Sequence, residues 1–564
     1  MMENNVKNFF KNRKILFAAW ACENEFYSTF KNWYQPLKSH FGDFPVFDPQ
    51  KYLYYYGEEE MNRMFMEKIE KEKPDYLLIW IVNEIVHLNT LKKIRERFPK
   101  IKIIAFYGDD DTQFEDVSRY VSLFCDYNLV FQKEYIDKYE QEGIQNVFFT
   151  CGGDVKMFKP EKLKKIYDVV FIGTPKKDYR YDLIKFIKEK GVNLKLFGFG
   201  WNNYPEFSDI YGGPLGNKDL IKVYNQSKIN LCFSRNDLGK PHMKGRIFKI
   251  AACKSFVLME NSPIYASLFN KNELVMFNDK NDLIKKINYY LKNEKERERI
   301  ADAIYKKIKL KYNLNSELSA FFKLVYKDEM AEKKTKDKKL WQLPKINDRV
   351  IILDEKEVNL SVQDLKKKTK DVDYIAFKTQ GADYLDNKNY FQIYSLEKSG
   401  KQMSCCDYFV YSEILGNYLM SISNETLTTN SKYFLIPILN INQLMVRKEF
   451  FFNNLENFRK LSNGVVVDFI NGENTIFVSF PFVRIKDDEV KFPGYEIMRK
   501  SFKMKFMSEI RTLMFQKKLF QSWYLYKLLV KGVDKPFIIR HLIECFKNKN
   551  KFETFKKINT TITR

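Results

Sequence analysis

The fold is decided by residues 167–201, YDVVFIGTPKKDYRYDLIKFIKEKGVNLKLFGFGW. The stretch begins with a short apolar strand, YDVVFIGT, continues with an amphipathic helix from Tyr181 to Lys190, and ends with a second strand, NLKLFGFG. Short Val, Ile, Leu and Phe runs that alternate with amphipathic helices are typical of a parallel sheet with crossover helices. Residues 167–201 therefore predict the start of a Rossmann-like lobe.

The same alternation continues on both sides of this stretch. Toward the C-terminus it passes through the strands KINLCFS, SFVLME and ELVMFND to a long helix from Asp282. Toward the N-terminus it runs back to Lys14 through the strands KILFAAW, YLLIWIV, KIIAFYG, YNLVFQ and VFFTCG. We therefore predict an α/β fold with two Rossmann-like lobes, residues 1–160 and 161–330, whose strand ends face each other across a ligand-binding cleft.

After Tyr326 the chain changes character. Residues 331–345 are charged, have no apolar period and predict a linker. Beyond them, RVIILD, DYIAFK and TIFVSFPFV are strand-like and the segments after Tyr495 are basic and helical, so residues 346–564 predict a C-terminal mixed α/β module. Because the linker has no apolar face, we expect the two lobes to be separable from this module.

The composition restricts partners and location. The formal net charge of +24 favours anionic partners, namely nucleotide phosphates, acidic glycans, an anionic membrane surface or nucleic acid. The eight cysteines are scattered and form no C-x-x-C pair, which is typical of free thiols in a reducing compartment. The sequence shows no ligand spacing typical of a zinc site. The N-terminus lacks a secretory signal, and the longest apolar run, Tyr76 to Val86, is too short to span a membrane. We expect a cytoplasmic protein, with peripheral contact at the inner face of the membrane left open.

Five motifs occur in order along the chain: CGGDVKMFKP, FIGT, GFGW, VYNQSKINLCFS and GRIFKIAAC. Their order and spacing resemble those of CgeB-like glycosyltransferases of the GT-B superfamily, over about Lys14 to Tyr326. The resemblance implies a nucleotide-sugar donor held mainly by the second lobe, an acceptor held by the first, retention of anomeric configuration, and neither a metal nor another cofactor.

Basic residues at two places suit a donor diphosphate, which needs fixed cations to neutralise the charge on the leaving group. Lys240, Lys244 and Arg246 lie at the start of a predicted helix, and Arg246 matches the family's arginine. Its fork can bind phosphate bidentately, so it is the first candidate for a catalytic clamp. Lys176 and Arg180 follow the FIGT strand on the same rim. The alternative for both groups is a solvated basic surface.

Glycines and a tryptophan close the strand NLKLFGFGW. Gly198 and Gly200 would let a ligand approach the backbone, and Gly213 would shape the nucleobase pocket. Trp201 would cover a base or sugar, or else pack in the core of the lobe.

Position 249 departs from the family pattern. CgeB-like proteins usually carry Phe-Glu where this chain has Phe248 and Lys249, and that glutamate resembles the ribose-binding carboxylate of the superfamily. Lysine cannot accept hydrogen bonds from sugar hydroxyls. Either the nucleotide is held differently, with Glu260 as the acceptor, or the protein is a catalytically silent scaffold.

The first lobe supplies carboxylates in FYGDDDTQF, directly after the strand KIIAF. Of this run we take Asp110 as the catalytic candidate, to bind acceptor hydroxyls or act as a base, with a simple Asx turn as the alternative. A retaining enzyme would not need a protein base. His242, close to Arg246 in sequence, is the candidate donor to the transferring sugar.

In the C-terminal module, DYIAFKTQGADYL faintly resembles the metal-site strand of GT-A glycosyltransferases. The only D-x-D there, Asp371 and Asp373, precedes the strand instead of ending it, so we predict a non-catalytic or degenerate module.

Together these patterns predict transfer of a sugar from a nucleoside diphosphate sugar to a glycan, lipid-linked glycan or protein, in surface polysaccharide or glycoconjugate synthesis. A nucleic-acid-binding protein is the remaining alternative. It is disfavoured because no recognition motif accompanies the charge.

Overall fold

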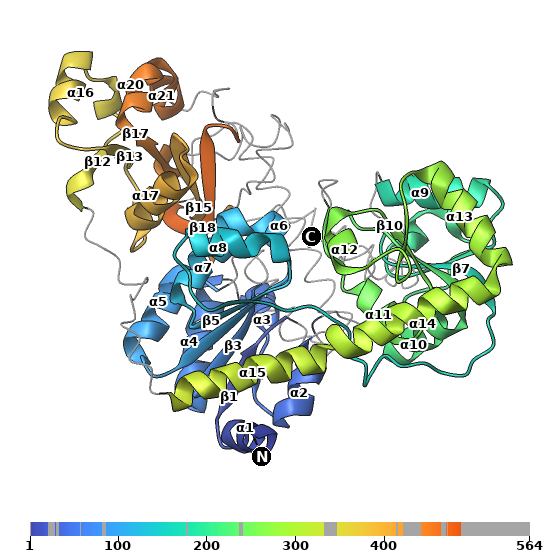
Figure 1. Ribbon diagram of the computed structural model, residues 1–564. Coiled ribbons are helices and arrows are strands. Elements are labelled where there is room, and N and C mark those ends of the chain that lie inside the picture. The colour runs from blue at the N-terminus through green and yellow to red at the C-terminus, as the bar shows by residue number, and fades with distance from the viewer. Residues whose placement is uncertain are drawn as a thin grey trace, which may run out of the picture.

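The computed structural model describes residues 2–20, 29, 33–56, 58–81, 86–175, 179–235, 241–331, 347–412, 416–420, 441–463, 470 and 472–486. They form three α/β units, each with its own sheet (Figure 1). The predicted fold class, two Rossmann-like lobes and a mixed C-terminal module, is confirmed. The predicted linker lies outside the described residues except for its first residue, and the basic segments after Tyr495 lie wholly outside them.

The first lobe is a parallel sheet in the order β2-β1-β3-β4-β5-β6. Its strands are β1 (Ile15–Ala18), β2 (Val46–Phe47), β3 (Tyr76–Ile81), β4 (Lys102–Tyr107), β5 (Tyr127–Val130) and β6 (Val147–Phe149). Its helices are α1 (Met2–Lys11), α2 (Gln35–Phe41), α3 (Pro49–Tyr56), α4 (Glu58–Glu72), α5 (Leu88–Arg97), α6 (Asp110–Gln113), α7 (Arg119–Val121) and α8 (Ile136–Gln141). Apolar clusters cover both faces of the sheet, which explains why its strands are continuous apolar runs.

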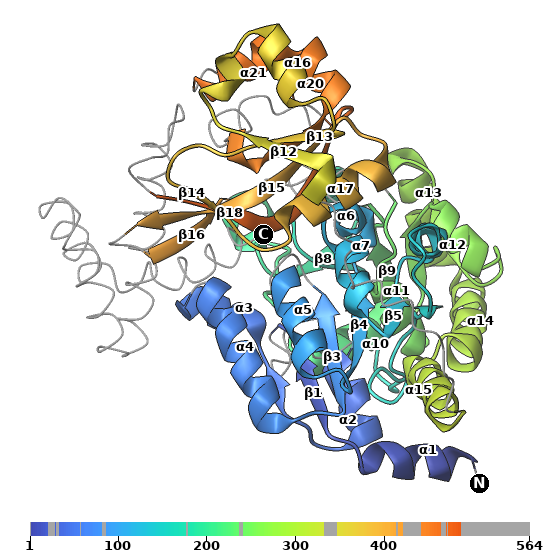
Figure 2. The ribbon, with the colours of Figure 1, turned by 90° about the vertical axis from the view of Figure 1, so that its left-hand side faces the viewer.

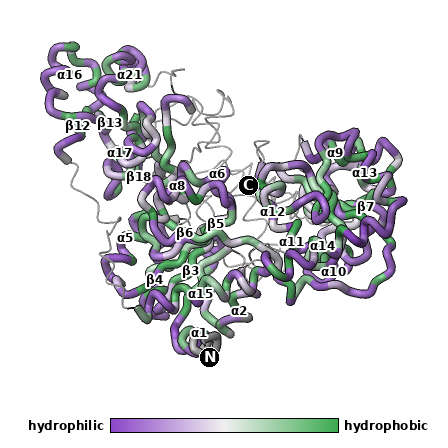
Figure 3. The backbone as a smooth tube through the Cα atoms, in the orientation of Figure 1, coloured by the Kyte–Doolittle hydropathy of each residue, from purple (hydrophilic) through white to green (hydrophobic). Residues whose placement is uncertain are grey.

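The second lobe is a parallel sheet in the order β11-β10-β9-β7-β8. Its strands are β7 (Tyr167–Ile172), β8 (Leu194–Phe197), β9 (Ser227–Cys232), β10 (Val257–Glu260) and β11 (Val275–Phe277). Its helices are α9 (Tyr179–Glu189), α10 (Asn217–Gln226), α11 (Arg246–Ala252), α12 (Pro263–Leu268), α13 (Lys280–Lys292) and α14 (Glu294–Lys311). Hydrophobic residues follow the strands, whereas α9 and α10 are mostly hydrophilic (Figure 3).

The chain then crosses back to the first lobe. After α14, helix α15 (Leu314–Met330) runs along the first lobe, where Phe321 and Phe322 share an apolar cluster with Phe10 of α1 (Figure 1). At the crossing, the N–H of Leu314 donates to the carbonyl of Gly153 (3.1 Å), in the connector between the lobes. The chain thus passes between the lobes twice, and a hydrogen bond joins the two crossing segments.

The C-terminal module is a mixed sheet in the order β12-β13-β17-β15-β18-β14, with β16 paired to β15. Its strands are β12 (Val350–Leu353), β13 (Tyr374–Phe377), β14 (Ala382–Tyr384), β15 (Met403–Ser412), β16 (Gly416–Met420), β17 (Leu444–Arg447) and β18 (Thr475–Lys486). Its helices are α16 (Val362–Lys368), α17 (Lys388–Ser399), α20 (Lys448–Asn453) and α21 (Leu455–Ser462). As predicted, Asp373 precedes β13, and its carboxylate pairs with Arg349 at 2.8 Å.

The module and the first lobe share one apolar core. Val478, Phe480 and Phe482 of β18 and Phe391 of α17 belong to the same buried cluster as Tyr120 of α7. The two units lie against each other in both ribbon views (Figures 1 and 2). This shared core predicts that the module does not separate from the first lobe, whereas the polar linker predicts that it does.

Two further sequence expectations concern the membrane and the thiols. Within the described ranges, no helix has both the length and the apolar character needed to cross a bilayer. The six cysteines that these ranges contain are all free.

Candidate functional site: cations and an acidic loop between the lobes

The carboxyl ends of β7 and β8 are packed unusually close together. Gly198 has φ 121°, and a Cβ there would lie 2.5 Å from the carbonyl oxygen of Gly173. A Cβ on Gly173 would in turn lie 2.7 Å from Nη2 of Arg246. Glycine is therefore required at position 198, where the neighbouring atom is backbone, whereas a side chain at position 173 would displace the guanidinium of Arg246. The guanidinium of Arg246 lies directly on the end of β7.

Three cations gather at this end of β7. The guanidinium carbons of Arg246 and Arg180 lie 5.2 and 5.8 Å from the centroid of the same Phe171 ring. Arg180 also donates from Nη1 to the carbonyl of Thr174 (2.9 Å). Burial, assisted by the charges of Arg180 and Arg246, lowers the pKa of Lys244 to about 8.

Like charges this close cost free energy unless an anion accompanies them. Asp109 and Asp111 of the first lobe offset part of this cost because they raise the pKa of Lys244, but burial has the larger effect and the pKa stays lowered. The group therefore has the electrostatic character of a site for a multiply charged anion.

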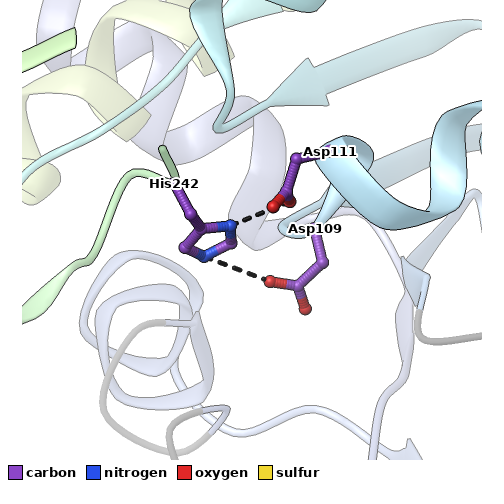
Figure 4. Close-up of side chains that lie close together, drawn as sticks. All are labelled: Asp109, Asp111 and His242. Carbon is purple, nitrogen blue, oxygen red and sulfur yellow. Dashed lines mark ion pairs between the residues drawn. The ribbon is translucent and has the colours of Figure 1, made fainter. Parts of the chain in front are cut away.

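An acidic loop of the first lobe meets a histidine of the second (Figure 4). His242 is buried, and its Nδ1 lies 2.8 Å from a carboxylate oxygen of Asp111, while its Nε2 lies 3.5 Å from Asp109. These contacts are ion pairs only when the imidazole is protonated, and Nε2 of Gln132 also lies 3.4 Å from Nδ1. An imidazole between two carboxylates can bind hydroxyl groups or exchange a proton. The three side chains offer ligand atoms within 4.8 Å of one another, so they are also the candidate cation ligands among the described residues.

Gln132 of the first lobe connects the two lobes beside this group through hydrogen bonds of its side chain. Its side-chain amide donates to the carbonyl of Gly108 (3.1 Å), and its oxygen accepts from the N–H of Met243 (3.1 Å). From the second lobe, the hydroxyl of Tyr265 accepts from the N–H of Lys244 and donates to the carbonyl of His242 (3.4 Å). The loop that carries His242 and Lys244 is therefore held from both sides.

The choice of Asp110 from the acidic run is corrected by the structure. Asp110 is the first residue of α6, and its side chain turns inward to accept from the hydroxyl of Tyr139 (3.1 and 3.2 Å). Successive helical residues point about 100° apart, so Asp110 faces the core of the lobe while its neighbours Asp109 and Asp111 face His242. Burial, the largest effect, raises the pKa of Asp110 to about 7.

Trp201 takes the second of its two expected roles and packs in the core of the lobe. Its side chain is 0% exposed, and its indole N–H donates to the carbonyl of Gly173 (2.6 Å), so it cannot cover a ligand. Phe199, two residues earlier, is 44% exposed between Gly198 and Gly200, which both have positive φ. Trp201 thus positions the end of β7, and Phe199 is the aromatic side chain available on this loop.

The remaining glycines shape the same loop. A Cβ on Gly200 would lie 3.1 Å from Cδ of Pro175. Gly213 has φ 87° with open space at its Cβ position, and its carbonyl accepts from the N–H of Gly198 (3.0 Å). Gly200 follows Phe199 in the chain, and Gly213 is hydrogen-bonded to Gly198. Ligand approach to the backbone at Gly200 and a nucleobase pocket at Gly213 stay predictions.

Glu260 does not provide the replacement for the missing family glutamate. It is buried at the end of β10 and accepts from the N–H of Ser234 (2.9 Å) and from Nε of Arg235 (2.7 Å). These bonds hold the loop after β9, so the carboxylate is used within the protein. Nζ of Lys249 lies 5.8 Å from the centroid of Phe158 in the interlobe connector.

Lys176 and Lys240 lie outside the described residues. Their predicted phosphate contacts stay predictions.

Several contributors to the site were not singled out from the sequence. Gln132 is the last residue of YNLVFQ, and Gly173 is the last residue of YDVVFIG. Their position at the carboxyl end of a strand was the feature that could have indicated them. Tyr265 lies within α12 and carried no signal.

The architecture is that of a two-lobed α/β protein with a group of cationic side chains on the second lobe and an acid–histidine group at the interface. Residues 180–322 match a family model described as glycosyl transferase-like. The chain is 22% identical over 261 residues to spore protein CgeB of Bacillus subtilis (strain 168), covering 42% of this chain and 79% of that protein. The resemblance to CgeB-like glycosyltransferases is thereby confirmed.

Solved structures similar to this chain include a sucrose-phosphate synthase from Thermosynechococcus elongatus, with a TM-score of 0.42, 9% identity, and coverage of 57% of this chain and 100% of that chain. They also include HepE of Anabaena in complex with UDP-glucose, with a TM-score of 0.41, 10% identity, and coverage of 56% of this chain and 100% of that chain.

Proposed function

We propose that this protein transfers a sugar from a nucleoside diphosphate sugar to an acceptor bound on the first lobe. The observation that carries the proposal is the group formed by Arg180, Lys244 and Arg246 at the end of β7. Their charges would neutralise the diphosphate as it leaves the sugar, which is where negative charge grows in the transition state.

The acid–histidine group would act on the acceptor side. Asp111 lies against His242, which would bind an acceptor hydroxyl, and Asp109 would bind a neighbouring hydroxyl. In a retaining transfer the departing diphosphate would take the proton of the acceptor hydroxyl. Because the cations already supply the charge that the diphosphate requires, we propose metal-independent transfer. Retention of configuration follows from the CgeB-like resemblance, and the acceptor is a glycan, lipid-linked glycan or protein of surface polysaccharide or glycoconjugate synthesis.

Calorimetry with UDP, GDP and uridine tests the donor site. We expect one diphosphate to bind at least tenfold more tightly than its nucleoside, because the cations act on phosphate. Arg246→Ala should remove this preference and lower sugar transfer by about 10²-fold, since a bidentate charge contact is lost in the transition state. Arg299→Ala, at an exposed arginine on α14, is the matched control and should resemble the parent.

Distinct results contradict distinct parts of the proposal. Diphosphate binding without turnover on any acceptor would favour the catalytically silent scaffold. Oligonucleotide binding with no response to UDP or GDP would favour the nucleic-acid-binding alternative, and near-normal turnover of Arg246→Ala would refute the assignment of the clamp.

A further inference from the structure

Residues 109–121 touch the second lobe at one end and the C-terminal module at the other. Asp109 and Asp111 face His242. Helix α6 then continues without interruption into a π-helical turn, Phe114–Ser118, and into α7. π-Helical turns are rare and occur frequently at functional sites. Nothing flexible separates the acidic loop from the turn that contacts the module.

The module holds the π-helical turn through a buried hydrogen bond. Asp116 is 4% exposed, and its Oδ2 accepts from the hydroxyl of Ser479 in β18 at 3.2 Å. One turn further on, the ring of Tyr120 packs edge-on against Phe391 and Phe480 of the module. Polar and apolar contacts therefore fix the same short segment.

A second polar contact lies on the other side of this segment. Arg119 is buried and forms an ion pair with Glu142 of the first lobe. Glu142 also accepts a hydrogen bond from the hydroxyl of Tyr394 in α17, and Lys398 lies 3.8 Å from it. Because buried charges are costly when a partner is lost, this network resists displacement of α7 from the module.

We propose that the C-terminal module is a positioning element, which holds Asp109 and Asp111 against His242 through the Ser479–Asp116 bond. This inference rests on the proposed function of the interlobe site. Asp111 and Asp116 are five residues apart, about 7.5 Å along a helix, so a shift of the turn carries the carboxylates with it. A displacement of about 1 Å is enough to cost orders of magnitude in rate. Ser479 is thus a positioning residue that touches no substrate.

Three variants of β18 test the link. Ser479→Ala removes the hydroxyl, Ser479→Thr restores it, and Arg484→Gln breaks another bond from the same strand to the first lobe. Arg484 pairs at 2.8 Å with Glu59 on α4, away from the acidic loop. We expect Ser479→Ala to lower kcat about tenfold with an unchanged KM for the donor, Ser479→Thr to recover it, and Arg484→Gln to match the parent.

Hydrogen exchange of the peptide 109–121 provides a measurement that does not depend on sugar transfer. The inference predicts faster exchange in Ser479→Ala and parental exchange in Arg484→Gln, because local opening follows the lost contact. Tyr394→Phe removes the hydroxyl that donates to Glu142 and should also speed exchange of this peptide. This variant provides the test if Ser479→Ala does not fold. If the parent transfers no sugar, the proposed function fails while exchange still decides the positioning role. Unchanged exchange in both variants, or equal effects of Arg484→Gln, would overturn the inference.

Discussion

Lys244 should take up a proton when a nucleoside diphosphate binds. Burial beside Arg180 and Arg246 lowers the pKa of Lys244 to about 8 in the free protein. A diphosphate against the ammonium would raise this pKa again, by about 1–3 units for an opposite charge in contact. Since binding favours the protonated form, affinity should be highest below pH 8 and fall as the pH rises above it.

The size of the effect follows from the pKa of about 8. If the bound form stays protonated, uptake should be about 0.1 proton per nucleotide at pH 7, about 0.5 at pH 8 and about 0.9 at pH 9. The same equilibrium makes the dissociation constant about tenfold larger at pH 9 than at pH 7. The terminal phosphate of UDP ionises near pH 6, so it contributes little to this change.

Calorimetry of UDP binding in two buffers with different ionisation enthalpies measures proton uptake directly. The matched variant is Lys244→Arg, which keeps the charge and cannot release the proton in this range. It should bind UDP with almost no uptake and a flat affinity between pH 7 and 9. The same uptake in Lys244→Arg as in the parent would refute the assignment, as would UDP binding by the parent without any uptake at pH 8.

Five further predictions concern the site and its surroundings. Burial raises the pKa of Asp110 to about 7, above its value in the unfolded chain. The free energy of unfolding should therefore fall as the pH rises from about 4 to about 7. Asp110→Asn should raise the urea midpoint at pH 8 but not at pH 4.5. Asp110→Asn should also leave sugar transfer near parental, whereas Asp111→Asn should lower it, and equal losses would contradict their different orientations. Phe199→Ala should weaken UDP binding by about 1–3 kcal/mol without loss of thermal stability if the exposed ring stacks on the base, and unchanged affinity would exclude stacking. Chelation with EDTA should leave turnover unchanged; a loss reversed by Mg²⁺ or Mn²⁺ would instead assign Asp109, Asp111 and His242 to a metal. Residues 1–335 expressed alone should be poorly soluble because the apolar cluster shared with the module becomes exposed, and a soluble monomer with parental stability would contradict this packing.

The sequence was sufficient for the elements of the two lobes but not for the direction of their side chains. The predicted helix from Tyr181 to Lys190 is α9, and the strand YDVVFIGT contains β7, because period and propensity are local properties. Which two of the three adjacent aspartates face His242 depends on where α6 begins, to within one residue. Sequence patterns place helix ends less accurately than that.

A similar limit applies to the aromatic pair in GFGW. Both rings follow the same strand, and the larger ring was preferred for stacking. Positive φ at Gly198 and Gly200 sends Phe199 outward and Trp201 into the core, a consequence of the tight contact with Gly173. Backbone conformation of this kind is set by tertiary packing.

The polar linker and strand β18 support opposite expectations about whether the module separates from the two lobes. A polar linker shows that the linker itself is solvated, but it carries no information about the faces of the units that it joins. The strand TIFVSFPFV gives that information. Side chains along a strand alternate between its two faces, and the apolar residues of this strand lie on both faces. Phe477 points into the core of the module, and Val478, Phe480 and Phe482 join the cluster of the first lobe. A strand that is apolar on both faces needs a covering layer on each side, and the first lobe supplies the second layer here. The same layer contains the π-helical turn behind Asp109 and Asp111, so the packing that joins the two units also reaches the proposed acceptor site.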